Sequence, residues 1–203
     1  GTLYNTYGFY AMYANVDRFV IDEQNLVPVK QRIELDRWII SKLQTLIEEV
    51  TAFYETFEPH RAARSIEEFV DEHLSNWYVR LSRRRFWRGE MSEDKKAAYE
   101  TLHECLLVVT QLMSPVAPFF SEWMYQNLTG TLREKAIANN TPLRWNSVHL
   151  TELTRAEKQN QDKALEERMD LAQKISSMVL SIRKKENIRV RQPLQRIQVP
   201  VLD

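Results

Sequence analysis

Apolar residues recur every three or four positions through long parts of this chain, and this spacing constrains its fold more than any other feature. One run begins at Leu35 and ends at Phe57, and a second begins at Ala62 and ends at Trp77. Because an α-helix turns about 100° per residue, residues at this spacing share one helix face. Glu58-Pro59 separates the two runs, and so short a connection predicts two antiparallel neighbouring helices.

Capping signals predict further helices. Ser92, followed by two acids, is a typical helix N-cap and predicts a third helix through Leu112. Ser114-Pro115 predicts the start of a fourth helix that ends near Leu128. The other expected elements are an aromatic-rich helix at 2–15, a long connection with one helical turn at 129–153, a fifth helix at about 155–185 and a strand from 188 onward.

These elements predict an all-α fold, an antiparallel helical bundle with a short β-like segment at the C-terminus. The 203 residues with 43% apolar content are enough to bury one sizeable core. Only four glycines are present, which argues against a β-rich fold and against the glycine-rich loops that bind phosphates.

Charge and hydropathy exclude several classes of protein. Lysine and arginine balance aspartate and glutamate at 28 each, so any electrostatic argument about partners must be local. The longest apolar stretches, such as LLVV at 106–109, are far shorter than the roughly 20 residues that cross a bilayer, so no membrane partner is expected. The single cysteine, Cys105, cannot form an internal disulfide, which is typical of a cytoplasmic protein.

No catalytic or metal-binding motif is present. The four histidines form no HExxH pattern, and one cysteine cannot make a CxxC zinc site. His73 lies on the apolar face of the second helix, where a structural histidine is the expected role. We therefore predict no catalytic residue, no metal ligand and no cofactor in this chain.

The most unusual segment is RLSRRRFWR at 80–88, with five arginines and two adjacent aromatic residues. If the second helix continues past Leu81, Arg84 and Arg88 extend the face that Trp77 buries. A buried unpaired arginine is costly. Either the helix ends here, or this face leaves the bundle and meets a ligand.

Three explanations fit this segment. Arginines neutralise phosphates and exposed aromatic rings stack on unpaired bases, which favours a nucleic acid. The arginines could instead pair with acids of the first helix, such as Glu48, Glu49 and Glu55, or dock on an acidic protein. Trp87 is expected to be exposed and Trp77 to be in the core. The candidate binding residues are Tyr78, Arg80, Arg83, Arg84, Arg85, Phe86, Trp87 and Arg88.

A second basic stretch lies at 183–196. Lys184, Lys185, Arg189 and Arg191 are candidates for a secondary nucleic-acid contact. A solvated helix end explains them equally well, because cations are favourable at a helix C-terminus.

Five longer segments carry a resemblance to known proteins. They are LDRWIISKLQTLIEEV at 35–50, FEPHRAARSIEEFVDEHLSNWYVRLSRRRFW at 57–87, LMSPVAPFFSEWMYQNL at 112–128, SVHL at 147–150 and IRVRQPL at 188–194. Together they resemble the anticodon-binding region of the isoleucyl-tRNA synthetases. Valyl- and leucyl-tRNA synthetases share the bundle and are the alternative within the group.

The resemblance implies a helical anticodon-binding domain at 26–187 that contacts isoleucine tRNA through the candidate residues. It also implies a linker helix from a catalytic domain at 1–25, and the start of a truncated C-terminal module at 188–203. A monomer is expected, with isoleucine tRNA and the rest of the synthetase chain as partners. A helical protein-interaction module that docks on an acidic partner is the alternative.

The resemblance further implies a parent enzyme that attaches isoleucine to its tRNA with ATP and magnesium and edits mischarged tRNA. The family's HIGH-like and KMSKS-like signatures are missing from these residues. Its structural zinc site has no ligand set in this chain either. The chain is thus expected to be a non-catalytic piece of the enzyme.

Overall fold

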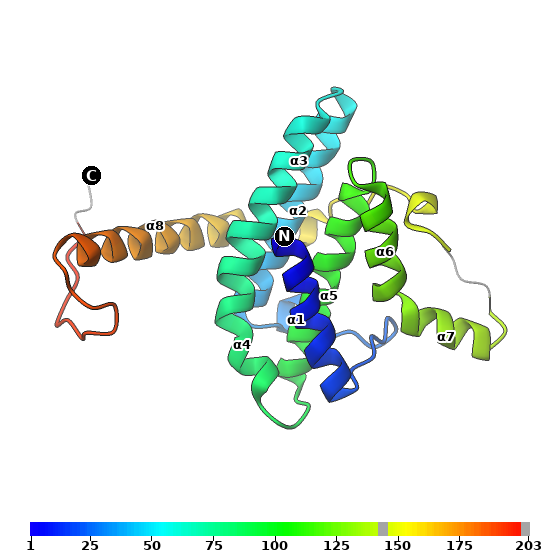
Figure 1. The fold of residues 1–203 in the computed structure, drawn as a ribbon, viewed down its shortest axis with the longest axis horizontal. Coiled ribbons are helices and arrows are strands. Elements are labelled where there is room, and N and C mark those ends of the chain that lie inside the picture. Colours follow the sequence, from blue (N-terminus) through cyan, green and yellow to red (C-terminus); the bar gives the residue numbers. More distant parts are fainter. Residues whose placement is uncertain (142–145, 200–203) are drawn as a thin grey trace. The chain divides into compact units, whose positions relative to one another are not determined.

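A computed structural model describes residues 1–141 and 146–199 of the chain (Figure 1). Over these residues the chain forms helices and loops and no β-strand, which confirms the all-α prediction. The chain divides into two compact units, Gly1–Asp162 and Lys163–Asp203, and each is described by itself.

The first unit is a bundle of antiparallel helices. Helix α2 packs against α3, and α5 packs against α1, α2, α4 and α6, as Figure 1 shows for the central part of the bundle. The expected helix near the N-terminus is present and also packs on the bundle. The elements are α1 (Thr2–Asp17), η1 (Val29–Gln31), α2 (Glu34–Glu55), α3 (Pro59–Glu68), η2 (Phe69–Val79), α4 (Arg80–Trp87), α5 (Glu93–Met113), α6 (Pro118–Leu128), α7 (Gly130–Ala138), η3 (Val148–Leu150) and η4 (Lys158–Asn160).

The apolar faces of α2, η2 and α5 meet in the core. Trp38 and Leu43 from α2, Leu74 from η2, and Tyr99 and Leu106 from α5 are fully buried. The apolar spacing in the sequence therefore identified the helices and the faces that pack together. Of the helices in the described ranges, none combines the length and the apolar content needed to cross a bilayer.

A π-helix changes which residues of the second long helix point inward. Elements α3, η2 and α4 follow one another directly, and η2 is a π-helix, whose turn is wider than that of an α-helix. In a regular α-helix a spacing of four residues drifts by about 40° per step, and the wider turn reduces this drift. One row of buried residues accordingly recurs four apart, at Val70, Leu74, Tyr78, Ser82 and Phe86, and Phe69 and Val79 are buried beside this row.

The predicted helical wheel was therefore wrong beyond Trp77. It assumed an uninterrupted α-helix and aligned Arg84 and Arg88 with the apolar face, from which we expected either the end of the helix or a face that leaves the bundle. In the structure Ser82 and Phe86 continue the buried face, and both arginines are exposed.

Ser92 caps α5 as predicted, because its Oγ accepts a hydrogen bond from the backbone N–H of Lys95 at 3.2 Å. The predicted start of the fourth helix was wrong. Ser114 ends α5, where its Oγ donates to the carbonyl of Gln111, and α6 starts at Pro118. Ala117-Pro118 thus provides the helix start that we assigned to Ser114-Pro115.

The connection at 129–153 and the start of the fifth helix also differ from expectation. Helix α7 has nine residues and is longer than the single turn expected. Its residues after Gly130 favour a helix, but they form no apolar stripe from which the helix could be predicted. Residues 142–145 of this connection lie outside the described residues. The segment expected to open the fifth helix is not helical at its start and instead lies against α2. There the backbone N–H of Glu157 donates to Gln44 Oε1 at 2.8 Å.

The second unit contains α8 (Lys163–Lys185) and the segment that follows it. The expected strand was wrong over the described residues 188–199, which form a turn at 190–191 and irregular backbone elsewhere. Asn187 takes a left-handed backbone conformation with φ 54°, and the N–H of Ile188 donates to the carbonyl of Arg183. Alternating residues need a partner strand to form a sheet, and the described ranges contain none. Residues 200–203 lie outside the described part.

Candidate nucleic-acid interface

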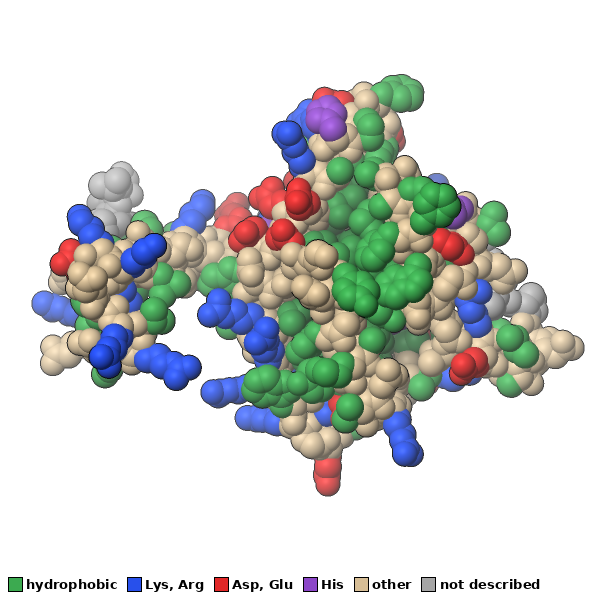
Figure 2. Space-filling view, viewed as in Figure 1, with side chains coloured by type: hydrophobic (Ala, Val, Ile, Leu, Met, Phe, Trp, Pro, Cys, Tyr) green, Lys and Arg blue, Asp and Glu red, His purple; other side chains and the backbone are tan. Residues whose placement is uncertain are grey.

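Five side chains from the RLSRRRFWR segment are exposed on and just after α4. We call Arg80, Arg83, Arg84, Trp87 and Arg88 the arginine patch. Within the part of the chain that the structure describes, none of its four guanidinium groups forms an ion pair or a hydrogen bond. Figure 2 shows Lys and Arg side chains gathered along α4. The patch therefore presents unneutralised positive charge to solvent.

Trp87 adds an aromatic surface to the arginine patch. Its side chain is 59% exposed, which confirms the prediction that it lies outside the core. Trp77 is half-buried. A large exposed ring beside unpaired guanidinium groups is suited to stacking on an unpaired base.

Two of the predicted binding residues lie in the core. Tyr78 is fully buried, and its hydroxyl donates to Asp36 Oδ1 at 2.8 Å. Phe86 is 1% exposed and packs edge-on against Tyr99, with ring centroids 4.9 Å apart. Neither side chain faces solvent, so we leave both out of the interface proposed below.

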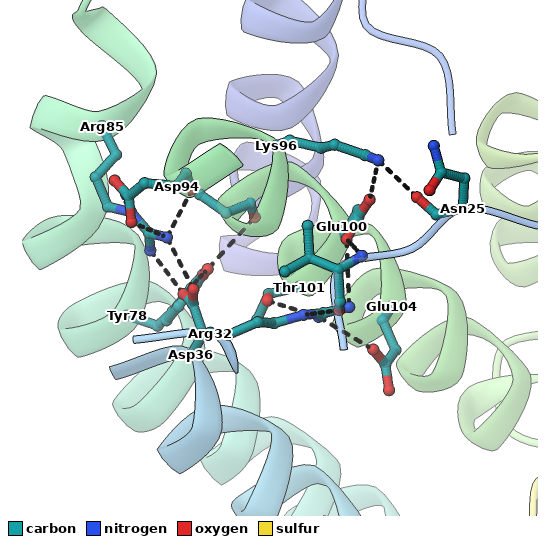
Figure 3. A network of polar contacts seen from close by, with 12 residues as sticks. Asn25, Arg32, Asp36, Tyr78, Arg85, Asp94, Lys96, Glu100, Thr101 and Glu104 are labelled. Carbon is teal, nitrogen blue, oxygen red and sulfur yellow. Dashed lines mark hydrogen bonds and ion pairs between the residues drawn. The ribbon is translucent and has the colours of Figure 1, made fainter. Parts of the chain in front are cut away.

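Arg85 differs from the other arginines because acids of two neighbouring helices hold it (Figure 3). Its Nη1 and Nη2 donate to Asp36 Oδ1 and Oδ2 at 2.6 and 2.8 Å. Its Nε donates to Asp94 Oδ2 at 3.0 Å, and Nη2 also donates to the backbone carbonyl of Asp94. Its side chain is only 12% exposed. Intramolecular pairing thus explains Arg85, but with different acids from those expected in the first helix.

The surroundings of Arg85 keep it charged. Burial of the guanidinium acts to lower its pKa, but the hydrogen bonds and the negative charge of Asp36, with a further bond from Asp94, outweigh burial and raise the pKa of Arg85. The same network holds Tyr78 protonated, because burial and the neighbouring Asp36 carboxylate raise the pKa of the Tyr78 hydroxyl.

Asp36 and Asp94 are the residues that sequence reasoning missed. Asp36 is fully buried in the first turn of α2, although it is an acid next to the apolar stripe. An acid at such a position signals a buried cation partner, because an unpaired buried charge is costly. The sequence shows that a partner is needed but does not show which arginine provides it.

A second buried cation in Figure 3 joins the loop before α2 to α5. Arg32 Nη1 donates to Thr101 Oγ1 at 2.9 Å, and Nη2 lies 3.4 Å from Glu100 Oε2. Arg32 Nε donates to the carbonyl of Val27. These contacts lie inside the bundle, so we assign Arg32 a structural role.

The secondary cluster lies in the second unit. Lys184, Lys185, Arg189 and Arg191 are all exposed near the end of α8. Arg183 instead turns back, and its Nη1 donates to the carbonyls of Arg189 and Gln192 at 2.8 and 2.9 Å. The guanidinium of Arg183 thus binds the backbone of the segment after α8 and holds it near the helix end.

In the described ranges, no three His, Cys, Asp or Glu side chains lie close enough together to hold a metal ion. His73 packs edge-on against the Trp38 ring, with centroids 5.8 Å apart, as a structural histidine would. The arginine patch is a charged and aromatic surface suited to binding.

The chain is similar to known proteins along its whole length. Residues 36–198 match the family described as the anticodon-binding domain of tRNA ligase. The chain is 50% identical over its whole length to the isoleucine–tRNA ligase of Bacteroides thetaiotaomicron and 49% identical to that of Porphyromonas gingivalis, in each case covering 17% of the relative. It is 39% identical to the isoleucine–tRNA ligase of Thermus thermophilus, over 95% of this chain and 18% of that protein.

The chain spans less than a fifth of the length of these relatives, and the matched family covers α2 through most of the second unit. The chain belongs to the family of anticodon-binding domains of tRNA ligases.

Proposed function

We propose that this chain binds the anticodon stem-loop of isoleucine tRNA through the arginine patch, as the anticodon-binding part of an isoleucine–tRNA ligase. The observation that carries the proposal is the group of four unpaired arginines and an exposed tryptophan on and just after α4, in a domain of this family. The guanidinium groups would contact phosphates or base edges, and Trp87 would stack on an unpaired base.

The reaction itself would belong to other parts of the ligase. There isoleucine would be activated with ATP and magnesium, joined to its tRNA and edited. The domain would act on that reaction indirectly, since binding energy far from the reacting ester holds the acceptor end in register. We further propose a cytoplasmic monomer in which Lys184, Lys185, Arg189 and Arg191 add a secondary contact.

A salt series tests the proposal. We expect the affinity for a transcript of the isoleucine anticodon stem-loop to fall log-linearly with salt concentration. Because each phosphate contact contributes about 0.7–0.9 to the slope, Arg83→Gln and Arg84→Gln should each reduce it by about that amount. The matched control is Arg64→Gln, an exposed arginine on α3 of the same long helix. Its slope should equal that of the unmodified chain.

Two results would count against the proposal. A stem-loop affinity that is undetectable even at low salt would exclude phosphate contact. Intact affinity in the Arg83 and Arg84 variants, with loss of docking to another protein, would favour the protein-interaction alternative. Replacing Lys184 and Lys185 with glutamine tests the secondary contact in the same assay.

A further inference from the structure

Arg85 lies in the middle of the binding segment but faces the bundle. Its guanidinium uses both Nη atoms on the carboxylate of Asp36 and its Nε on Asp94, while the adjacent Arg83 and Arg84 project to solvent. Four of the five N–H donors of Arg85 are used within the bundle, and its side chain is only 12% exposed, so the guanidinium is held for structure rather than offered to a phosphate.

Asp36 holds the long helix at two points. Its Oδ1 accepts hydrogen bonds from Tyr78 at 2.8 Å and from Arg85 at 2.6 Å, about two turns further along the helix. Asp36 belongs to α2 and Asp94 to the first turn of α5. The pair of acids therefore fixes α4 against two other helices, as Figure 3 shows.

The arginine patch depends on this attachment. Arg83, Arg84 and Trp87 all lie within two residues of Arg85 on α4, which is only eight residues long. The helix ends at Trp87, and Lys95 Nζ donates to the carbonyl of Arg88 at 2.7 Å just beyond it. In the same turn, Phe86 is buried against Phe9 and Tyr99. The Arg85 contacts add the polar attachment of this turn to α2 and α5, and this attachment fixes the direction of the neighbouring exposed side chains.

We propose that Arg85 is a positioning residue for tRNA binding, and that Asp36 and Asp94 act through it to set the direction in which α4 presents the arginine patch. This inference rests on the proposed function. It reverses the role that the sequence suggested for Arg85, from an RNA contact to the support of the RNA contacts.

The two roles predict opposite effects of neutralising the acids. Removing a negative charge beside an RNA-binding surface should tighten binding if charge alone matters, and it would also free Arg85 to reach a phosphate. If Arg85 is a positioning residue, removing its anchor should weaken binding. Asp36 is fully buried and cannot touch the RNA itself, so its effect must pass through the protein.

The test measures stem-loop affinity below the melting temperature for Arg85→Gln, Asp36→Asn and the double variant. We expect each single change to weaken binding by about fivefold to tenfold, and the double variant to be no weaker than either single variant, because the two residues act as one unit. Arg85→Lys keeps the charge but loses the two-pronged geometry, so partial rescue is expected. Hydrogen exchange at the α4 amides should become faster in the same variants.

Asp94→Asn serves as the second variant in case Asp36→Asn does not fold. Asp94 is 49% exposed, so its replacement should preserve the fold, yet the positioning role still predicts weaker binding. Glu90→Gln is the matched control, an exposed acid in the loop between α4 and α5. It should leave binding unchanged or make it slightly tighter.

Unchanged or tighter binding in Asp94→Asn and Arg85→Gln would overturn the proposal. So would a lower melting temperature with unchanged affinity, since Arg85 would then be purely structural. If Arg83→Gln and Arg84→Gln also leave the salt slope unchanged, the proposed interface itself fails and the positioning role fails with it. That outcome is distinct from a failure confined to Arg85 and its acids.

Discussion

The Nζ of Lys95 lies 2.6 Å from Oδ2 of Asp17, and this ion pair joins the end of α1 to the first turn of α5. The Tyr99 hydroxyl also donates to the same carboxylate oxygen. Elsewhere on α1, Phe9 packs edge-on against Phe86, with ring centroids 5.1 Å apart. Helix α1 thus packs on η2 and α5 and contacts α4 through the Phe86 ring. Whether residues 1–25 also link to a catalytic domain stays a prediction.

Asp17→Asn should destabilise the bundle. Partial burial acts to raise the pKa of Asp17, but hydrogen bonds from Lys95 and Tyr99 and the charge of Lys95 outweigh it and lower that pKa. The stabilisation is therefore present above about pH 4 and is lost as the pH falls through the lowered pKa. We expect a loss of about 1–3 kcal/mol in the free energy of unfolding at pH 7.

Urea denaturation at pH 7 and at acidic pH checks this expectation. The difference between Asp17→Asn and the unmodified chain should shrink at acidic pH. Asp22→Asn, an exposed acid in the following loop, is the control and should change stability by less than about 0.5 kcal/mol. Equal effects of the two variants would contradict the assigned role of the Asp17 ion pair.

Two leucines of the same long helix test the phase that the π-helix sets. Leu74 is fully buried, whereas Leu81 is 53% exposed. Leu74→Ala should lower the free energy of unfolding by about 2–5 kcal/mol. Leu81→Ala should change it by less than about 0.5 kcal/mol. Similar losses in thermal denaturation would show that the helix does not have this phase in solution.

Buried His103 should make stability depend on pH. Burial lowers its pKa, against a hydrogen bond from Nε2 to the Leu128 carbonyl that acts to raise it. Below about pH 6.5 the unfolded chain binds a proton that the folded chain does not. The free energy of unfolding therefore decreases as the pH is lowered, by up to about 1.4 kcal/mol per pH unit.

Denaturation at several pH values between roughly 7.5 and 5.5, where histidine titrates, measures the change in unfolding free energy with pH. His103→Gln should reduce it, and His60→Gln, an exposed histidine on α3, should leave it unchanged. A slope that persists unaltered in His103→Gln would assign the pH dependence to other groups.

Trp87→Ala should weaken stem-loop binding without unfolding the chain. Stacking on a base contributes about 1–3 kcal/mol, and the side chain is exposed, so the melting temperature should not change. Phe119→Ala removes a ring that is 91% exposed on α6 and is the control. Fluorescence titration with the stem-loop measures both variants. Equal affinities would show that Trp87 does not stack on the RNA.

The sequence by itself determined most of the helices and the buried face of α2 and α5. The apolar spacing from Leu35 to Phe57 and the Ser92 cap are local signals, and local signals survive in the fold. The concentration of arginines at 80–88 was also visible at once, as was the resemblance of the surrounding segments.

The tertiary structure decided which of those arginines face solvent. The π-helix shifted the buried face to Ser82 and Phe86, and no spacing rule for α-helices contains that shift. Asp36 and Asp94 reach Arg85 from other helices, 49 and 9 residues away in sequence. The strand expected at the C-terminus failed for the same reason, because strands and ion pairs depend on partners that are distant along the chain.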